Sequence, residues 1–342
     1  MKKTNLLKAA VSLLLSATVL FTGCTALTDG VAGGETEAGG ERSINGRKSF
    51  IYTRSLSSSA LENPNDFDYI YLFNLKLQKR SSDKGIKEYT YNQYYLDVDS
   101  FNNKFGSKIS SFSSKSKLIL TFGSDGAQKY YIQQVLSNSS RREQLVKDLK
   151  KLVNSTYKIG GLDIDWEFNG SGSWTDDDGN KQYFSDAGNS YNSEKLATFI
   201  SELKSGSNKI SRVTLCCRND ETVISKMNEK GCFDNVDYLN LMGYEGNVDT
   251  AGKNAERLRG WTWSSKVNFG IGLYHSDKNR AITFADWVKS KWNDGASYGV
   301  VFFAADKDKN TYQGKDKDGW HSAKKGQLAL IKYLKGDYYK LK

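Results

Sequence analysis

The chain has 342 residues, long enough for a sizeable core, with 49 basic and 39 acidic residues and a formal net charge of +10. Its Lys and Arg residues are scattered without a run of five, so we read them as a solvated basic surface and not as a nucleic-acid-binding face. Aromatic residues make up 13% of the chain, and flat side chains of this kind can stack on the apolar faces of sugar rings.

The N-terminus is typical of an exported protein. A basic head precedes an apolar run, residues 9–20, that is too short to span a bilayer. The run ends in the sequence LFTGC, which resembles a bacterial lipoprotein box in which Cys24 becomes the lipidated first residue. We therefore expect a signal peptide over residues 1–23 and a membrane attachment at the cell envelope through the lipid. Phe21 is atypical for this box, so simple secretion is the alternative.

A flexible linker is expected over residues 24–47, which are rich in Gly, Glu, Thr and Ala and lack periodicity. Residues 48–342 then form a single domain. The three remaining cysteines, Cys216, Cys217 and Cys232, are expected to be free buried thiols. Adjacent residues point to opposite faces of a strand, so at most one of the first two could reach the third, and a domain of this size needs no disulfide.

Strand-like and helix-like patterns alternate along residues 48–342, which is the sign of a parallel sheet with crossover helices. Strands are expected at residues 49–53, 67–73, 117–123, 158–168, 212–218, 237–245, 266–273 and 298–306. Apolar residues at helical spacing predict helices at residues 141–154, 192–205, 221–230, 250–258, 281–292 and 322–334. This pattern predicts an α/β fold, a (β/α)8 barrel of the TIM type.

The fourth of these strands carries the candidate chemistry. It alternates acidic and apolar residues, so Asp163, Asp165 and Glu167 project from one face and apolar side chains from the other. An apolar back means that the strand is covered, so the acids point into an enclosed space such as the mouth of a closed barrel. A solvated groove or a cation site are the alternatives, but straight spacing spreads the acids over roughly 13 Å, which suits a metal poorly.

The last two acids suit proton transfer. Asp165 lies close enough to Glu167 for like-charge coupling, which raises the pKa of one partner and keeps it protonated near neutral pH. Glu167 is nearer the carboxyl end of the strand and is the better placed proton donor. Glycosidases usually place two carboxyls on opposite sides of the scissile bond, which two acids on one strand cannot do. The pattern therefore calls for a nucleophile that the protein does not supply.

The acidic run resembles the D-x-x-D-x-D-x-E signature of family 18 glycoside hydrolases, the chitinases and endo-β-N-acetylglucosaminidases. Asp163, Asp165 and Glu167 match its last three acidic positions, and Gly160 stands at the first. The resemblance implies that the 2-acetamido oxygen of the substrate is the nucleophile. It also implies that Glu167 is the general acid and later base, that Asp165 holds the acetamido group, and that Asp163 tunes Asp165.

Other strand ends extend the resemblance. The sequence TFGS at residues 121–124 is similar to the S-x-G-G of the family's third strand, and MGYE at residues 242–245 looks like the M-x-Y-D of its sixth. Tyr244 would then hydrogen-bond the acetamido carbonyl, and Glu245 replaces the family's Asp. Phe303 falls where chitinases carry a Trp under the sugar. Taken alone, Tyr244 and Phe303 are better read as core residues; their positions at the carboxyl ends of expected strands favour a site role for Tyr244 and leave both readings open for Phe303.

Two connections bear on the cleft. Residues 169–191 are expected to form a polar loop at the carboxyl mouth, able to bring Trp174 or Tyr183 to a sugar subsite. Its acidic run, residues 176–180, lacks the full ligand spacing of a calcium loop, so we expect a solvated loop tip. The short link at residues 274–280 leaves no room for the α+β insertion of many processive chitinases, which favours an open groove.

The resemblance implies a monomeric hydrolase that needs no metal or cofactor and cuts β-1,4 bonds next to N-acetylglucosamine with retention of configuration. Chitin and chito-oligosaccharides are the expected partners and substrates, followed by the chitobiose core of N-glycans. The alternative is a sugar-capturing lipoprotein without catalysis, although the presence of Glu167 and Tyr244 favours an enzyme. The expected substrate-binding residues are Phe303, Glu245, Met242, Trp174, Tyr71 and Gly123.

Overall fold

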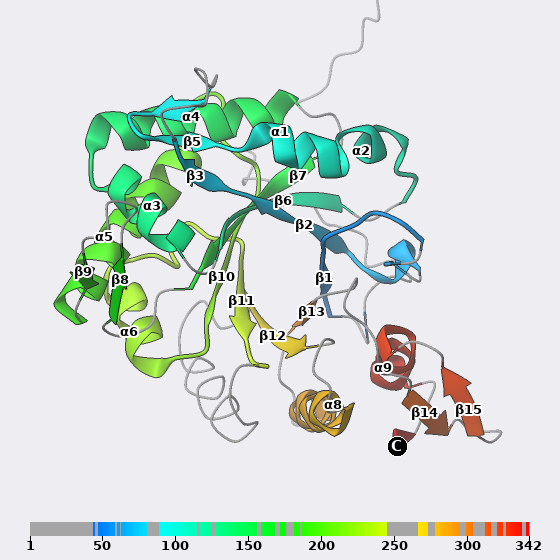
Figure 1. Ribbon diagram of the computed structural model, residues 1–342. Helices are drawn as coiled ribbons and strands as arrows, with labels where there is room; N and C mark the ends of the chain where they lie inside the picture. The colour runs from blue at the N-terminus through cyan, green and yellow to red at the C-terminus, as the bar shows by residue number, and fades with distance from the viewer. Residues whose placement is uncertain are drawn as a thin grey trace, which may run out of the picture. The chain divides into compact units, whose positions relative to one another are not determined.

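The predicted strands close into a parallel barrel in the computed structural model of the protein (Figure 1). The structure describes residues 44, 47–58, 60–61, 63–80, 89–114, 117–124, 127–155, 159–167, 172–175, 181–184, 186–244, 266–272, 278–293, 299–303, 312–315, 320–323, 326–336 and 340–341. All of them belong to the second of the chain's two units, Gly39–Lys342. The signal peptide, Cys24 and nearly all of the linker therefore lie outside the described residues.

Each barrel strand pairs in parallel with its neighbours in the chain, and the last pairs with the first. The order is β1 (Ser49–Thr53), β2 (Tyr69–Leu75), β6 (Lys117–Ser124), β7 (Ile159–Trp166), β10 (Val213–Arg218), β11 (Tyr238–Met242), β12 (Val267–Gly272) and β13 (Gly299–Phe303). Strands covered on both faces read as continuous apolar runs, and every residue of β1, β2 and β12 is buried. The (β/α)8 barrel predicted from the sequence is confirmed.

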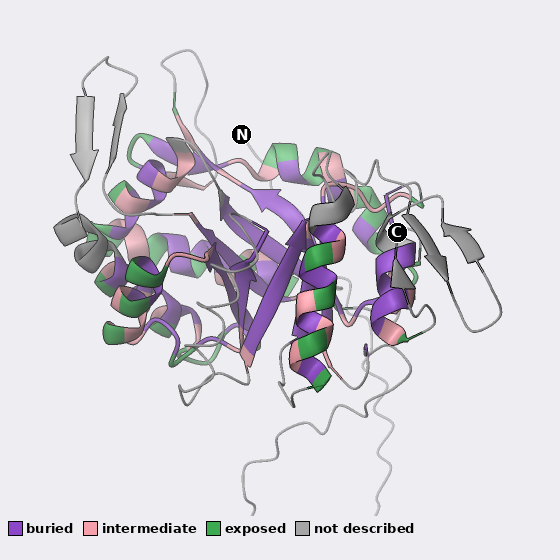
Figure 2. Cartoon of the chain, turned by 90° about the horizontal axis from the view of Figure 1, so that it is seen from below, coloured by how far each residue is buried: buried purple, intermediate pink, exposed green. Residues whose placement is uncertain are grey.

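Amphipathic helices cover the outside of the barrel. They are α3 (Ala127–Leu136), α4 (Ser139–Ser155), α5 (Asp186–Leu203), α6 (Glu221–Glu229), α8 (Lys278–Asn293) and α9 (Gly326–Lys335). Figure 2 shows that the barrel strands are mostly buried, whereas the helices around them are buried on one face and exposed on the other. On α4 the buried stripe includes Leu145, Leu149 and Val153, at the spacing that places side chains on one helical face. The helix expected at residues 250–258 lies outside the described residues.

The alternation of side chains along the strands divides the apolar core in two. The larger cluster fills the space between barrel and helices and includes Leu162, Ile164 and Trp166 of β7. The smaller cluster fills the barrel interior with Phe50, Tyr52, Tyr69, Tyr71, Phe73, Ile119, Cys216, Met242, Tyr244 and Val301. Because adjacent strand residues point to opposite faces, most strands contribute to both clusters, whereas the apolar residues of β7 and β12 belong to the outer cluster alone.

Short elements outside the barrel differ from the sequence prediction. The polar loop expected at residues 169–191 contains a hairpin, β8 (Gly172–Thr175) with β9 (Lys181–Phe184), and α5 already begins at Asp186. The helix expected at residues 322–334 begins only at Gly326. Residues before it form β15 (Trp320–Ala323), which pairs with β14 (Tyr312–Lys315), and β14 pairs with β16 (Lys340–Leu341). These strands are short, and their polar sequences carry little of the apolar pattern on which the prediction relied.

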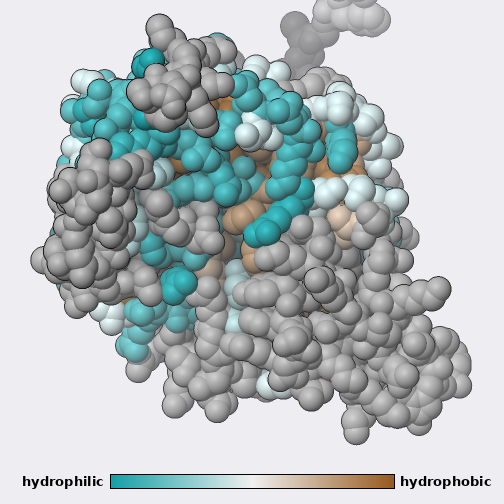
Figure 3. Space-filling view, in the orientation of Figure 1, coloured by the Kyte–Doolittle hydropathy of each residue, from teal (hydrophilic) through white to brown (hydrophobic). Residues whose placement is uncertain are grey.

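A second small sheet consists of β3 (Leu77–Lys79), β5 (Tyr94–Leu96) and β4 (Thr90–Tyr91), followed by α1 (Val98–Phe101), the π-helical turn Asn102–Gly106 and α2 (Ser107–Ser111). Between β12 and α8 only residues 273–277 intervene, so no α+β insertion interrupts the barrel there, as the short link predicted. None of the helices in the described ranges is long and apolar enough to cross a bilayer. Figure 3 shows a surface face on which hydrophilic side chains predominate around smaller apolar areas.

Candidate active site

The acidic residues of β7 point into the barrel. Asp163 is fully buried and Asp165 is 2% exposed, whereas the apolar residues between them pack outward against the helices. Glu167 follows the last residue of β7, and its side chain is 15% exposed. The carboxylate column therefore runs from the closed interior to the barrel mouth, with Glu167 as its most accessible member.

Asp163 accepts hydrogen bonds from two other strands. The Thr214 hydroxyl on β10 donates to Oδ1 at 2.6 Å, and the Tyr52 hydroxyl on β1 donates to Oδ2 at 2.9 Å. Tyr52 in turn accepts from Nδ2 of Asn240 on β11 at 3.1 Å, and Oδ1 of Asn240 accepts from Nδ2 of Asn268 on β12 at 2.9 Å. In this series of hydrogen bonds every donor is directed toward Asp163, so the network is oriented to stabilise a negative charge on Asp163.

Burial and hydrogen bonding have opposite effects on the pKa of Asp163. Burial raises the pKa of Asp163 to about 6, because a charged carboxylate is poorly solvated inside the barrel, and the hydrogen bonds from Thr214 and Tyr52 limit the rise. The pKa of the Tyr52 hydroxyl is raised well above its usual range by burial and by the charge of Asp163. Tyr52 therefore stays a neutral donor. Asp163 has a pKa of about 6, so a small change in its surroundings can change its charge near neutral pH.

Asp165 lies one layer higher, between β6 and β10. Its neighbours in register are Gly123 on β6 and Cys216 on β10. A Cβ atom at Gly123 would collide with the backbone carbonyl of Asp165, and Gly123 has a φ of +115°, so only glycine fits this close approach. Nδ2 of buried Asn74 donates to the Gly123 carbonyl at 2.6 Å and holds the turn from the other side. The predicted Gly123 thus supports the backbone under Asp165.

The Cys216 thiol faces the same layer and stays protonated. Burial raises its pKa well above the usual range, and the charges of Asp165 and Asp163 add to the effect. Cys217 and Cys232 are also buried and free, as the sequence predicted. Their pKa values are raised by burial as well, so none of the three has the character of a reactive thiolate.

An aromatic wall stands next to the carboxylates. The rings of Tyr244 and Phe303 stack with their centroids 5.6 Å apart and their planes within 11°. Phe303 also meets Tyr52 and Phe73 edge to face, at 5.8 and 5.5 Å. Met242 belongs to the same interior cluster. Residues from β1, β2, β11 and β13 therefore converge, and Tyr244 and Phe303, predicted from separate strand ends, are in direct contact.

At the mouth, Glu167 meets a cation that the sequence prediction did not include. Nη2 of Arg218, the last residue of β10, lies 3.6 Å from Oε2 of Glu167. The register explains the contact, because Cys216 pairs with Asp165 and Cys217 with Trp166, which places Arg218 beside Glu167.

These features agree with the comparison of the chain with known proteins. The family model described as "Glycosyl hydrolases family 18" matches residues 48–336. The chain belongs to this family. No match was found among curated proteins.

Solved structures share the fold at low sequence identity. The chain is similar to the family 18 chitinase from Cycas revoluta, solved in complex with (GlcNAc)3, with a TM-score of 0.56, 12% identity and coverage of 86% of this chain and 100% of that one. Chitinase ChiA74 from Bacillus thuringiensis gives a TM-score of 0.56 and 12% identity over 86% of this chain and 71% of that one. The catalytic domain of a fern chitinase, from Peteris ryukyuensis, gives a TM-score of 0.52 and 14% identity, with coverage of 85% of this chain and 100% of that one.

Within this family 18 barrel, not every predicted residue joins the constellation. Tyr71 is fully buried and stacks on Tyr52 at 4.5 Å, so it packs below the mouth. Glu245 lies outside the described residues. Trp174 is in strand β8 of the hairpin that follows β7, and Tyr183 is in β9; only the backbone of this hairpin is described.

The sequence reasoning missed Tyr52, Thr214, Asn240, Asn268 and Arg218. A weak signal was present, because each polar residue interrupts an apolar strand at a position that faces inward. In the described part of the chain, no group of three or more His, Cys, Asp or Glu side chains is arranged to hold a metal ion.

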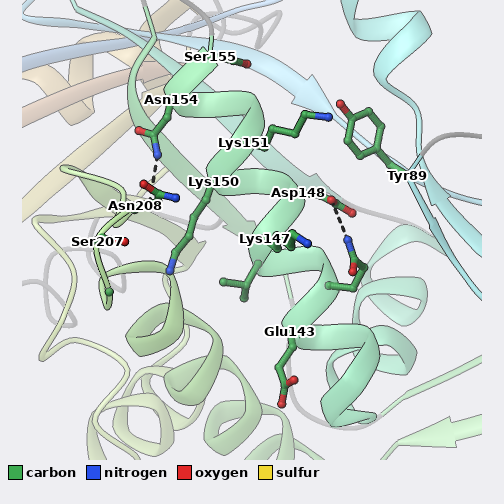
Figure 4. Close-up of a pocket in the computed structure, with 13 residues that line it drawn as sticks. Tyr89, Glu143, Lys147, Asp148, Lys150, Lys151, Asn154, Ser155, Ser207 and Asn208 are labelled. Carbon is green, nitrogen blue, oxygen red and sulfur yellow. Dashed lines mark hydrogen bonds between the residues drawn. The ribbon is translucent and has the colours of Figure 1, made fainter.

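A hollow of about 950 Å³ lies on the outer side of α4, and none of the three carboxylates Asp163, Asp165 and Glu167 lines it (Figure 4). Its lining includes Tyr89, Lys150 and Asn208. Lys150 donates to the Ser205 carbonyl at 2.8 Å, and Asn154 donates to the Asn208 carbonyl at 3.1 Å, so these polar groups tie α4 to the turn before β10. The lining follows α4 from Glu143 to Ser155, so the hollow runs along the outside of this helix and not in the barrel mouth, where barrel enzymes place their chemistry.

Proposed function

We propose that the protein is a retaining glycoside hydrolase that cuts β-1,4 bonds next to N-acetylglucosamine. The observation that carries this proposal is the inward column Asp163, Asp165 and Glu167, which shares the barrel interior with the stacked pair Tyr244 and Phe303. The carboxylates on one strand suit a reaction in which the substrate supplies the nucleophile.

In the proposed reaction the acetamido oxygen of the substrate attacks the anomeric carbon and the glycosidic bond breaks. Glu167 gives its proton to the departing oxygen, and the bonded acetamido group becomes an oxazolinium ion. Asp165 accepts the acetamido N–H and offsets the positive charge, while Tyr244 donates to the acetamido oxygen. Water then attacks the anomeric carbon, Glu167 takes a proton from that water, and the bond from the anomeric carbon to the acetamido oxygen breaks, so two inversions retain the configuration.

Asp163 would assist this reaction through its charge, without touching the substrate. The donors around it favour its charged form, and that charge lies one strand period below Asp165. As the oxazolinium ion forms, the negative charges of Asp165 and Asp163 both stabilise its positive charge, which is a transition-state effect and not a uniform gain in binding.

Chitin or chito-oligosaccharides are the substrates we propose first. The similar Cycas revoluta chitinase was solved with (GlcNAc)3, which supports a chito-oligosaccharide as the probe. The short link at residues 273–277 supports an open groove and cuts within a chain, and the chitobiose core of N-glycans would also enter such a groove. We further propose that the chain is exported, lipidated at Cys24 and monomeric.

The experiment compares wild type with E167Q on chito-oligosaccharides and on intact glycoproteins. E167Q should lose turnover by about 10²- to 10⁴-fold while it still binds the oligosaccharide, because Gln keeps the shape of Glu but cannot act as a general acid or base. E143Q is the matched control, since Glu143 is an exposed acid on α4. Equal turnover by wild type and E167Q would contradict the proposal. Binding without hydrolysis by wild type would instead support a non-catalytic glycan-binding protein, a role that the Arg218–Glu167 ion pair favours.

A further inference from the structure

The ion pair at the barrel mouth conflicts with the role proposed for Glu167. A general acid must carry its proton when the substrate arrives. A guanidinium within ion-pair distance favours the ionised carboxylate, whereas the neighbouring Asp165 favours the protonated one. Arg218 is 32% exposed and Glu167 15%, so solvent weakens the attraction without removing it.

Other groups that face this part of the barrel have smaller effects on whether Glu167 is protonated or ionised. On β10 the Cys216 thiol is held neutral by burial. Beyond β10, the inward residues Met242 and Tyr244 are neither acidic nor basic, and on the other side of β7 the described inward residue Gly123 lies beside Asp165 and has no side chain. Among the described residues on these strands, Asp165 and Arg218 are therefore the two charged groups that compete for Glu167.

We propose that Arg218 is a positioning residue that holds the Glu167 carboxylate in its ionised form and so confines hydrolysis to a more acidic range than the barrel would otherwise allow. This inference rests on the proposed function for its effect on hydrolysis. The ion pair itself is independent of that function. It predicts that Glu167 titrates at lower pH with Arg218 present than without it.

The placement of Arg218 also gives it a second effect on the same carboxyl. The guanidinium 3.6 Å from Oε2 also attracts that oxygen and so favours one orientation of the Glu167 carboxyl, and the rotamer of Glu167 decides whether the proton can reach the glycosidic oxygen. Removal of the guanidinium should therefore raise the pH range of the reaction and at the same time loosen the orientation of the acid. The first effect moves the pH profile, and the second lowers kcat at every pH.

The test measures the titration of Glu167 directly. The full chain is labelled with ¹³C at the Glu side-chain carboxyls, and the Glu167 signal is assigned by its loss in E167Q. In R218Q and in R218M, which keeps the aliphatic stem, the midpoint of Glu167 should rise by about one pH unit. R218K keeps a positive charge and should leave the midpoint near that of wild type.

The matched control is R142Q. Arg142 also forms an ion pair with a Glu, Glu202, but on the outside of the barrel with its Nη2 at 2.9 Å. R142Q should leave the Glu167 midpoint unchanged. An unchanged midpoint in R218Q and R218M, or an equal shift in R142Q, would overturn the proposal. Having two neutral variants keeps the test decisive if one fails to fold.

Hydrolysis provides a separate readout. The alkaline limb of kcat/KM on chito-oligosaccharides should move upward in R218Q by the same amount as the Glu167 midpoint, and R142Q should match wild type. A moved midpoint with an unmoved limb would show that Arg218 does not set the range of hydrolysis and would overturn that part of the proposal. If wild type shows no hydrolysis at all, the proposed function fails while the carboxyl titration still decides whether Arg218 governs Glu167.

Discussion

The Tyr52 hydroxyl on β1 donates a 2.9 Å hydrogen bond to Asp163 on β7, across the interior of the barrel. The two residues are 111 positions apart in the chain, and only closure of the barrel brings them together. This bond connects the aromatic wall to the carboxylate column, because the Tyr52 ring also contacts Phe303 and Tyr71.

Replacing Tyr52 with Phe should weaken both stability and activity. The variant leaves Asp163 with one donor fewer and leaves the Asn240 amide without its acceptor, at a cost of about 2 kcal/mol in the free energy of unfolding. Activity should fall about tenfold or more, because Asp163 then ionises less readily below Asp165. Urea unfolding and kcat on chito-oligosaccharides measure the two effects.

The Tyr91–Asp148 pair provides the control for Tyr52. It is also a buried Tyr–Asp hydrogen bond of 2.9 Å, but it lies between the small sheet and α4. Y91F should lose similar stability and keep wild-type kcat. If Y91F and Y52F lower kcat equally, the effect of Tyr52 is one of stability alone.

The buried Asp163 should make stability depend on pH. Its pKa is raised from 3.8 to about 6, so the folded state holds this proton more tightly than the unfolded state. The contribution of Asp163 to stability is therefore largest below about pH 4 and falls as the pH rises to about 6, by at most roughly 3 kcal/mol. Urea unfolding of wild type and D163N from pH 4 to 7 measures this. The stability of wild type relative to D163N should decline over that range, and parallel curves would refute the prediction.

Substituting Ala for Gly123 should disturb the backbone of Asp165. A Cβ atom there meets the Asp165 carbonyl, and a φ of +115° adds strain, so we expect a loss of about 2 kcal/mol or more and a clear drop in kcat. G206A separates the two causes. Gly206 also has a positive φ, of +74°, but a Cβ there meets nothing within 4 Å, so G206A should cost about 1 kcal/mol and leave kcat unchanged.

Removing the aromatic face at Phe303 should weaken sugar binding. F303L retains an apolar side chain but cannot stack on a sugar ring, so the Kd for a chito-oligosaccharide, measured by calorimetry on the E167Q background, should rise about five- to tenfold. F302L is the neighbouring control, because Phe302 packs outward against Phe67 at 6.0 Å. If F302L and F303L weaken binding alike, Phe303 is not part of the sugar site.

The sequence was sufficient to predict the barrel and the direction of its acids, because both depend on local alternation. The expected strand at residues 49–53 coincides with β1, and the period of two correctly placed Asp163 and Asp165 inside and Trp166 outside. Side-chain contacts between different strands could not be predicted from the sequence. The pairing of Arg218 with Glu167 depends on register, and the path from Asn268 through Asn240 to Tyr52 depends on closure. Neither property is encoded within one strand.

The configuration of the first product tests the central claim most directly. If the substrate's acetamido oxygen attacks and the β7 carboxylates assist, NMR during the hydrolysis of a chito-oligosaccharide should show the β-anomer of the new reducing end first, followed by slow mutarotation. The α-anomer appearing first would mean direct attack by water and would contradict the account.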